Sequence, residues 1–74
     1  DCAVGAFAHV APGAVLAGTV TVGDDAHVGA GAAVIQGRTI GASAIVGAGS
    51  VVTKDVPDGE TWFGNPARAR QVHA

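Results

Sequence analysis

The sequence predicts an all-β solenoid, in which short strands and turns repeat at a fixed interval. An aliphatic residue returns every six positions from Val4 to Val52. A strand has a side-chain period of 2 and a helix one of 3.6, so a period of six needs a repeating unit with its own turn. The composition agrees, because the 74 residues include 12 glycines but only two phenylalanines and one tryptophan.

The other positions of each six-residue unit, or hexad, are also ordered. The second residue is Gly or Ala except at Ile35 and Thr53, and the fifth is small or β-branched except at Arg38. Three hexads make one triangular coil of 18 residues, so residues 18 apart stack in neighbouring coils about 4.8 Å apart. We expect β-helix repeats over residues 1–57, and a C-terminal cap or tail of the same domain over 58–74.

This tandem pattern resembles the hexapeptide repeat of the left-handed parallel β-helix acyltransferases. The resemblance covers residues 1–70. It implies the left-handed coil, which periodicity does not give because parallel crossovers are otherwise right-handed. It also implies a homotrimer, and the exposed edges of so short a prism favour partners too. The chain contains no methionine and starts within a hexad, so we expect it to be a fragment.

Charge and hydropathy argue against several partners. A net charge of −2 with four Lys and Arg residues offers no basic patch for nucleic acid and no polybasic signal for a membrane. No segment approaches the roughly 18 apolar residues of a membrane span, and the first residues do not show the charged-then-apolar pattern expected of a signal peptide. We therefore expect a soluble, cytoplasmic protein. The single cysteine, Cys2, falls at an inward fifth position, where a small core residue is expected and a reactive thiol is the alternative.

Two histidines occupy the sixth position of hexads one coil apart. We expect His9 and His27 to stack on one edge, with Ile45 at the equivalent place in the next coil. An imidazole ordinarily titrates near neutral pH, so it can act as a general base, a hydrogen-bond partner or a metal ligand. For His27, a solvated surface histidine is the alternative.

The stretch around His9 resembles one branch of the family, the bacterial amino-sugar acetyltransferases. The branch includes sialic acid O-acetyltransferases and enzymes that N-acetylate a UDP-linked 4-amino sugar. The resemblance rests on Asp1-Cys2 and the following Ala8-His9-Val10-Ala11-Pro12-Gly13-Ala14. In that branch a catalytic histidine precedes an acidic residue, and a second histidine eight positions beyond the acid contacts the acetyl donor. The resemblance gives Asp1 and His9 these last two roles and puts the base just before Asp1. A carboxylate there would stabilise the imidazolium, whereas a solvated aspartate is the alternative.

Small residues also recur one coil apart, in Gly29-Ala30-Gly31 and Gly47-Ala48-Gly49. They leave backbone amides and carbonyls open to a thin ligand, although glycines that only serve tight turns are the alternative. In the family, acetyl-CoA lies parallel to the helix axis between two subunits. The resemblance places its contacts at Ala30 and Ala48.

The last part of the chain carries a second family signature. Pro57-Asp58-Gly59 predicts a turn that ends the regular repeat. The following Gly64-Asn65-Pro66-Ala67-Arg68 is characteristic of hexapeptide acetyltransferases, in which this segment lies near the CoA adenine and phosphates. The resemblance makes Asn65 a cofactor-binding residue. Lys54, Arg68 and Arg70 are candidates to hold CoA phosphates, with solvated surface cations as the alternative.

Three further expectations concern packing. Trp62 and Phe63 should cap the open hydrophobic end of the prism, with stacking on the CoA adenine as the alternative. Residues 67–74 are candidates for a short helix. Arg38 should be accommodated by a local distortion of the coil, because burying an unpaired guanidinium is costly. Pairing with a group at a subunit interface is the alternative for Arg38.

Three classes of function fit these features. The first is an acetyltransferase that moves an acetyl group from acetyl-CoA to an amine or hydroxyl of a nucleotide-linked or acidic sugar, with no metal. The second is a structural or oligomerising solenoid without catalysis. The third is a metal protein of the gamma carbonic anhydrase type, in which histidines from two subunits hold zinc, although the spacing of His9 and His27 is not that family's.

Overall fold

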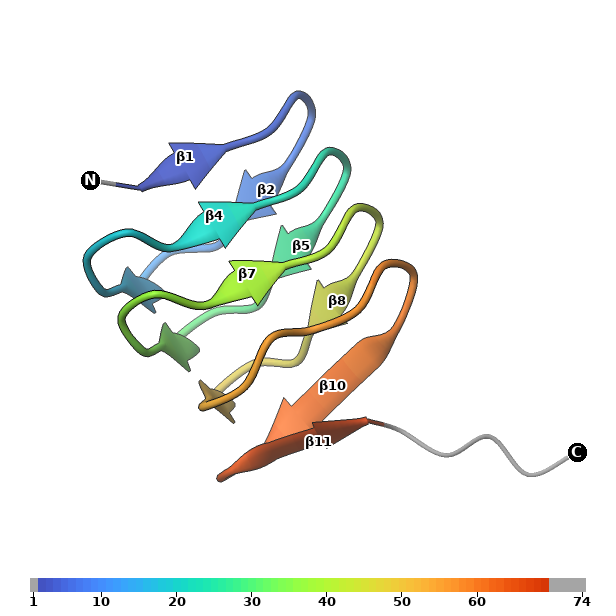
Figure 1. Ribbon diagram of the computed structural model, residues 1–74. Helices are drawn as coiled ribbons and strands as arrows, with labels where there is room; N and C mark the ends of the chain where they lie inside the picture. The colour runs from blue at the N-terminus through green and yellow to red at the C-terminus, as the bar shows by residue number, and fades with distance from the viewer. Residues whose placement is uncertain (1, 70–74) are drawn as a thin grey trace, which may run out of the picture.

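The computed structural model describes residues 2–69, which form a stack of short strands joined by tight turns (Figure 1). Within them, nine two-residue strands build the regular coils: β1 (Ala3–Val4), β2 (His9–Val10), β3 (Val15–Leu16), β4 (Thr21–Val22), β5 (His27–Val28), β6 (Ala33–Val34), β7 (Thr39–Ile40), β8 (Ile45–Val46) and β9 (Val51–Val52). Two longer strands follow, β10 (Thr61–Gly64) and β11 (Ala67–Ala69). The described residues contain no helix that is long and apolar enough to cross a membrane.

Three sheets form the sides of a prism. Sheet A has the order β1-β4-β7, sheet B the order β11-β10-β8-β5-β2, and sheet C the order β3-β6-β9. The strands of the regular coils pair in parallel and in a register of 18 residues, as Val4 with Val22 and Val10 with Val28. The predicted all-β solenoid and its 18-residue coil are therefore confirmed, and the stack is consistent with a left-handed parallel β-helix.

First and fifth hexad positions supply the core. The most deeply buried side chains include Val20, Val22, Val28, Val34, Ile40, Val46, Ser50, Val52 and Val56. The first coil is more open: Val4 is 51% exposed, because no described coil lies over it. For the same reason Cys2 is exposed, so the prediction that it belongs to the core is wrong. Its Sγ instead lies 3.2 Å from the carbonyl oxygen of Ala17, at the rim of the prism.

Each turn of the regular coils places its fourth hexad residue in the left-handed region. The φ angle is 59–61° at Phe7, Thr19, Asp25 and Ser43, and 71–79° at Gly13, Gly31, Gly37 and Gly49. The second position has a different constraint, which explains why Gly or Ala stands there in most hexads. A Cβ added to Gly23 or to Gly29 would lie 2.6 Å from a backbone nitrogen of the next coil.

The register changes once along the stack. Val52 pairs with Val34, 18 residues earlier, but Val56 bridges Ile40 and Trp62 pairs with Val46, each 16 residues earlier. The turn after β9 is therefore two residues shorter than the others. Val56 is buried, but it stacks on a first-position residue, so its assignment to a fifth position is wrong. The predicted turn at 57–59 is present, with the Glu60 amide donating to the Pro57 carbonyl at 3.3 Å, and strand pairing continues beyond it.

Strands β10 and β11 close the far end of the stack (Figure 1). Trp62 is 9% exposed and continues the column of Val28 and Val46, which confirms its predicted capping role. Phe63 is 47% exposed because successive side chains of a strand point to opposite sides, so the same prediction is wrong for Phe63. Residues 67–69 pair antiparallel with β10 instead of forming the predicted helix. The rest of that predicted helix, residues 70–74, lies outside the described residues.

Candidate functional site

The turns stack into three corners that run along the prism. We name the aspartate corner between sheets A and B (residues 5–8, 23–26, 41–44 and 57–60), the alanine corner between sheets B and C (11–14, 29–32 and 47–50) and the arginine corner between sheets C and A (17–20, 35–38 and 53–55). Backbone hydrogen bonds join the coils at each of them. At the alanine corner, for example, the Gly49 amide donates to the Ala30 carbonyl at 2.9 Å.

At the aspartate corner, side chains also accept hydrogen bonds from two third-position amides. The Ala6 amide donates to Asp24 Oδ1 at 2.8 Å, and the Ala42 amide donates to Asp58 Oδ1 at 2.9 Å. Asp24 lies one regular coil from Ala6, whereas Asp58 reaches Ala42 across the shorter register. Both amides are therefore already paired within the protein.

At the alanine corner the equivalent amides are open. Within residues 2–69, no protein group accepts a hydrogen bond from the amides of Ala30 and Ala48. Both residues are exposed, and the residue one coil beyond Ala30 is Ala48, which has no carboxylate to offer. Gly31 and Gly49 have no side chains to cover the corner. Open amides thus stand where acetyl-CoA contacts were predicted, and the contacts themselves stay a prediction.

The outer side of sheet B carries the two histidines. His9 and His27 are directly paired across β2 and β5, with ring centroids 4.7 Å apart and an interplanar angle of 29°. The predicted stacking is confirmed, but the rings lie on a flat face of the prism and not on an edge. Each histidine precedes a third-position residue of the alanine corner by three residues along the chain. Ile45 follows in the same column and is 46% exposed. In the part of the chain that the structure describes, no group of three or more His, Cys, Asp or Glu residues could hold a metal ion.

Two other predicted cofactor residues lie at the opposite edge of sheet B. Asn65 is in the turn between β10 and β11, and Arg68 is on β11; both are exposed. Arg68 Nη1 donates to the Ala67 carbonyl at 3.1 Å. Strands β2 and β11 are the outer strands of this sheet, so His9 and Arg68 are separated by about 19 Å at the usual strand spacing. A long ligand parallel to the axis could therefore contact both.

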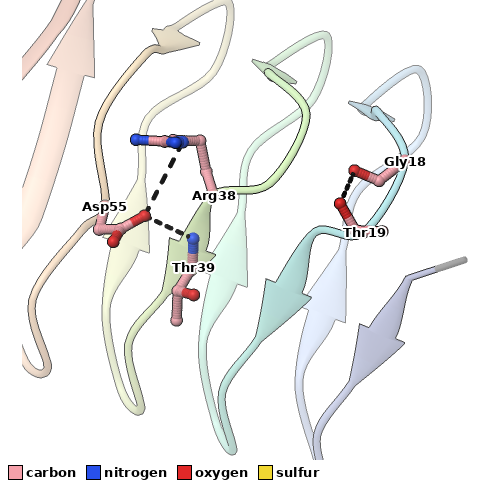
Figure 2. A network of polar contacts seen from close by, with 5 residues as sticks. All are labelled: Gly18, Thr19, Arg38, Thr39 and Asp55. Atoms are coloured by element: carbon pink, nitrogen blue, oxygen red, sulfur yellow. Dashed lines mark hydrogen bonds and ion pairs between the residues drawn. The ribbon is translucent and has the colours of Figure 1, made fainter.

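Lys54 lies elsewhere, on the arginine corner, so sheet C separates it from the alanine corner within one chain. Arg38 lies on that corner too. Figure 2 shows its guanidinium beside the shortened turn, with Nε 3.9 Å from Asp55 Oδ1, which also accepts a hydrogen bond from the Thr39 amide at 2.9 Å. The turn 35–38 keeps the regular 18-residue register, and the shortened turn that carries Asp55 lies one coil further on. The Arg38 side chain is 37% exposed. Asp1 and Arg70 lie outside the described residues.

The sequence analysis missed one residue beside the candidate site. Ser50 is 1% exposed, and its hydroxyl accepts a hydrogen bond from the Gly64 amide at 3.1 Å. This bond ties the β10–β11 hairpin to the alanine corner. The available signal was a serine at a fifth position whose counterparts in the other coils, Ala14 and Ala32, have no polar group.

Several solved structures are similar to this chain in fold and sequence. Perosamine N-acetyltransferase from Caulobacter crescentus, as a mutant in complex with CoA and GDP-perosamine, is 50% identical with a TM-score of 0.96, and the match covers 97% of this chain and 34% of that one. WeeI from Acinetobacter baumannii AYE is 47% identical with a TM-score of 0.92, over 95% of this chain and 35% of WeeI. The acetyltransferase domain of PglB from Neisseria gonorrhoeae FA1090, in complex with acetyl coenzyme A, is 43% identical with a TM-score of 0.93, over 95% and 34% of the two chains.

The predicted resemblance to the hexapeptide-repeat acyltransferases is confirmed, because these solved structures are similar to the chain in both fold and sequence. This hexapeptide-repeat chain spans about a third of the length of these relatives. No protein-family model and no curated protein sequence matches it. The residues described above thus form a β-solenoid that is similar to one part of each of these relatives.

Proposed function

We propose that this chain supplies the acetyl-CoA site of an acetyltransferase that N-acetylates a nucleotide-linked amino sugar. The observation that carries the proposal is the pair of open amides at Ala30 and Ala48. They lie one coil apart, at the corner that borders the face carrying His9 and His27. The similar proteins support the two ligand classes. The perosamine enzyme was crystallised with CoA and GDP-perosamine, and the PglB domain with acetyl coenzyme A.

The proposed ligand lies along the alanine corner. Its acetyl end would be near His9, its pantetheine arm would accept hydrogen bonds from the open amides, and its nucleotide end would be near Asn65 and Arg68. The positions of these residues at opposite edges of sheet B support this direction. Arg68 supports it further, because a guanidinium suits the planar hydrogen-bonding geometry of phosphates.

The proposed reaction is a direct transfer. The amine nitrogen attacks the thioester carbonyl and gives its proton to a histidine, which the resemblance puts just before Asp1 and outside this sequence. A backbone amide or His9 stabilises the negative charge that develops on the carbonyl oxygen. The carbon–sulfur bond then breaks, and CoA leaves as its thiolate. An amine acceptor is preferred over a hydroxyl because the perosamine enzyme is an N-acetyltransferase.

The proposal includes a homotrimer. The outer side of sheet C borders the alanine corner and presents only apolar side chains, those of Val15, Ala33 and Val51. Val15 is 61% exposed within one chain. A flat apolar surface of this kind favours contact between copies. Lys54, on the other border of sheet C, would then act on a ligand held by a neighbouring copy.

Calorimetric titration of acetyl-CoA, with the mass in solution measured in parallel, tests the proposal. We expect binding by a species of three chains. Ala48→Leu should weaken acetyl-CoA binding by about fivefold, because the side chain covers the open amides and one lost hydrogen bond is worth roughly 1 kcal/mol. Ala6→Leu is the matched control, since Ala6 is exposed at the same hexad position of the aspartate corner. Its affinity should equal that of the unmodified chain.

Two results would contradict the proposal. Unchanged affinity in Ala48→Leu would reject the alanine corner as the binding groove. Absence of binding by a well-folded trimer of the unmodified chain would instead favour a structural solenoid without catalysis.

A further inference from the structure

The proposed reaction uses only one of the two stacked histidine rings, that of His9, and gives no role to the ring of His27. His27 lies directly below His9 in the parallel pair of β2 and β5, and the two rings stack at a centroid distance of 4.7 Å. That distance and the 29° angle between the planes fall in the range of offset aromatic stacking. The contact is therefore a packed pair of rings on an otherwise exposed face.

The stack is the interaction that orients His9. Its imidazole is exposed, and no group among residues 2–69 is hydrogen-bonded to either ring nitrogen. An exposed imidazole turns broadly about its terminal torsion unless a neighbour packs against it. His27, in the following coil, is the neighbour that packs against the His9 ring. Ile45, one coil further on, is paired with His27.

We infer that His27 is a positioning residue, which holds the His9 ring in the plane needed to contact the acetyl group of the donor. The inference rests on the proposed function, because it gives His27 a purpose only if His9 contacts acetyl-CoA. Holding a side chain in its bound orientation before binding reduces the entropy lost on binding. A gain of that origin is specific to the contact that His9 makes. It should therefore affect acetyl-CoA more than CoA, which has no acetyl group.

Two substitutions separate the ring of His27 from its nitrogens. His27→Phe keeps an aromatic ring and removes the nitrogens, whereas His27→Gln keeps hydrogen-bonding groups and removes the ring. The measurement is the ratio of the dissociation constants of CoA and acetyl-CoA, by calorimetry on the 74-residue chain. A general loss of structure would weaken both ligands and leave this ratio unchanged. His9→Ala supplies the value of the ratio without the His9 contact.

We expect His27→Gln to lower the preference for acetyl-CoA by about three- to tenfold, towards the His9→Ala value, and His27→Phe to keep most of it. A native ratio in His27→Gln would overturn the inference. So would a loss in His27→Phe as large as that in His27→Gln, because the nitrogens of His27 would then act directly.

Proton NMR of the His9 ring tests the stack without any ligand. Its ring protons should be shifted by the ring current of the neighbour in the unmodified chain and in His27→Phe, and should return to solvent-exposed values in His27→Gln. Exposed values in the unmodified chain would overturn the inference. A normal ring-current shift in a trimer that binds no acetyl-CoA would instead refute the proposed function.

Discussion

The aspartate corner and the alanine corner are built from the same turn, yet they treat the backbone differently. In both, a second-position glycine packs against the backbone of the next coil. At the aspartate corner, carboxylates one coil away accept hydrogen bonds from the amides of Ala6 and Ala42. At the alanine corner, the amides of Ala30 and Ala48 have no such partner within the described chain.

The difference shows how a repeat can separate stability from binding. A peptide N–H must be hydrogen-bonded by protein, water or ligand. The aspartate corner satisfies this need internally at Ala6 and Ala42, although no described group accepts a hydrogen bond from the amide of Asp24 between them. At the alanine corner, the amides of Ala30 and Ala48 are left to donate hydrogen bonds to solvent or to a ligand. The small residues around them leave space for a ligand to reach these amides. One third-position residue per coil is enough to decide between these outcomes.

The largest effect should come from the feature that the corners share. Gly23→Val and Gly29→Val each force a side chain into the backbone of the next coil, so both should destabilise the fold by about 3 kcal/mol or more. In so small a domain, loss of the β-sheet circular dichroism signal is expected for both. Gly18→Ala is the control, because an added Cβ there has no atom within 4 Å, and its stability should change by at most about 0.5 kcal/mol. A folded Gly29→Val protein would show that the alanine corner packs less tightly than the aspartate corner.

Converting one corner into the other should have the next largest effect. Ala48→Asp places a carboxylate one coil from Ala30, as Asp24 is placed relative to Ala6. The new side chain should accept a hydrogen bond from the open amide of Ala30. We therefore expect the affinity for acetyl-CoA to fall by at least about tenfold and the melting temperature to stay the same or rise. Ala48→Asn distinguishes blocking from charge repulsion, since an amide oxygen can accept the same hydrogen bond without a negative charge. Native affinity in both variants would mean that the ligand does not use the Ala30 amide.

Opening the aspartate corner should have the smallest effect. Asp24→Ala removes the acceptor of the Ala6 amide, which should lower the free energy of unfolding by about 1–2 kcal/mol, measured by urea denaturation. Affinity for acetyl-CoA should not change, because this corner does not border the proposed groove. Asp25→Asn is the control, since asparagine tolerates the left-handed backbone there and the Asp25 side chain has no hydrogen bond to residues 2–69 that could be lost. Equal destabilisation by both variants would argue against the capping role of Asp24.

Most of the fold could be predicted because aliphatic residues recur without interruption from Val4 to Val52. The shorter register could not. Val56 fits the β-branched fifth position of an 18-residue coil and equally the aliphatic first position of a shorter one, so residue type alone does not choose between them. The pairing of Val56 with Ile40 assigns Val56 to the first position, and that contact is visible only in the structure. Cys2 fits a core position by spacing, but burial also requires a coil on its outer side.

The candidate site could be predicted in part. The small residues at Ala30 and Ala48 indicated the alanine corner, and the spacing of His9 and His27 indicated their stacking. The distinction between corners was missed because it depends on a side chain in the next coil, such as Asp24 for Ala6. The equivalent contact of Asp58 with Ala42 does not even keep the 18-residue spacing, so a search at that interval would not find it.

The turn after β9 is shorter by an even number of residues, and this parity has a consequence for how such chains can change length. Side chains of a strand alternate between two faces, so removing one residue would turn every later strand inside out. Removing two leaves Val56 and Trp62 facing inward. Insertions and deletions that evolution can accept in this prism should therefore fall in the corners and come in pairs, unless the corner itself absorbs the odd residue as a bulge.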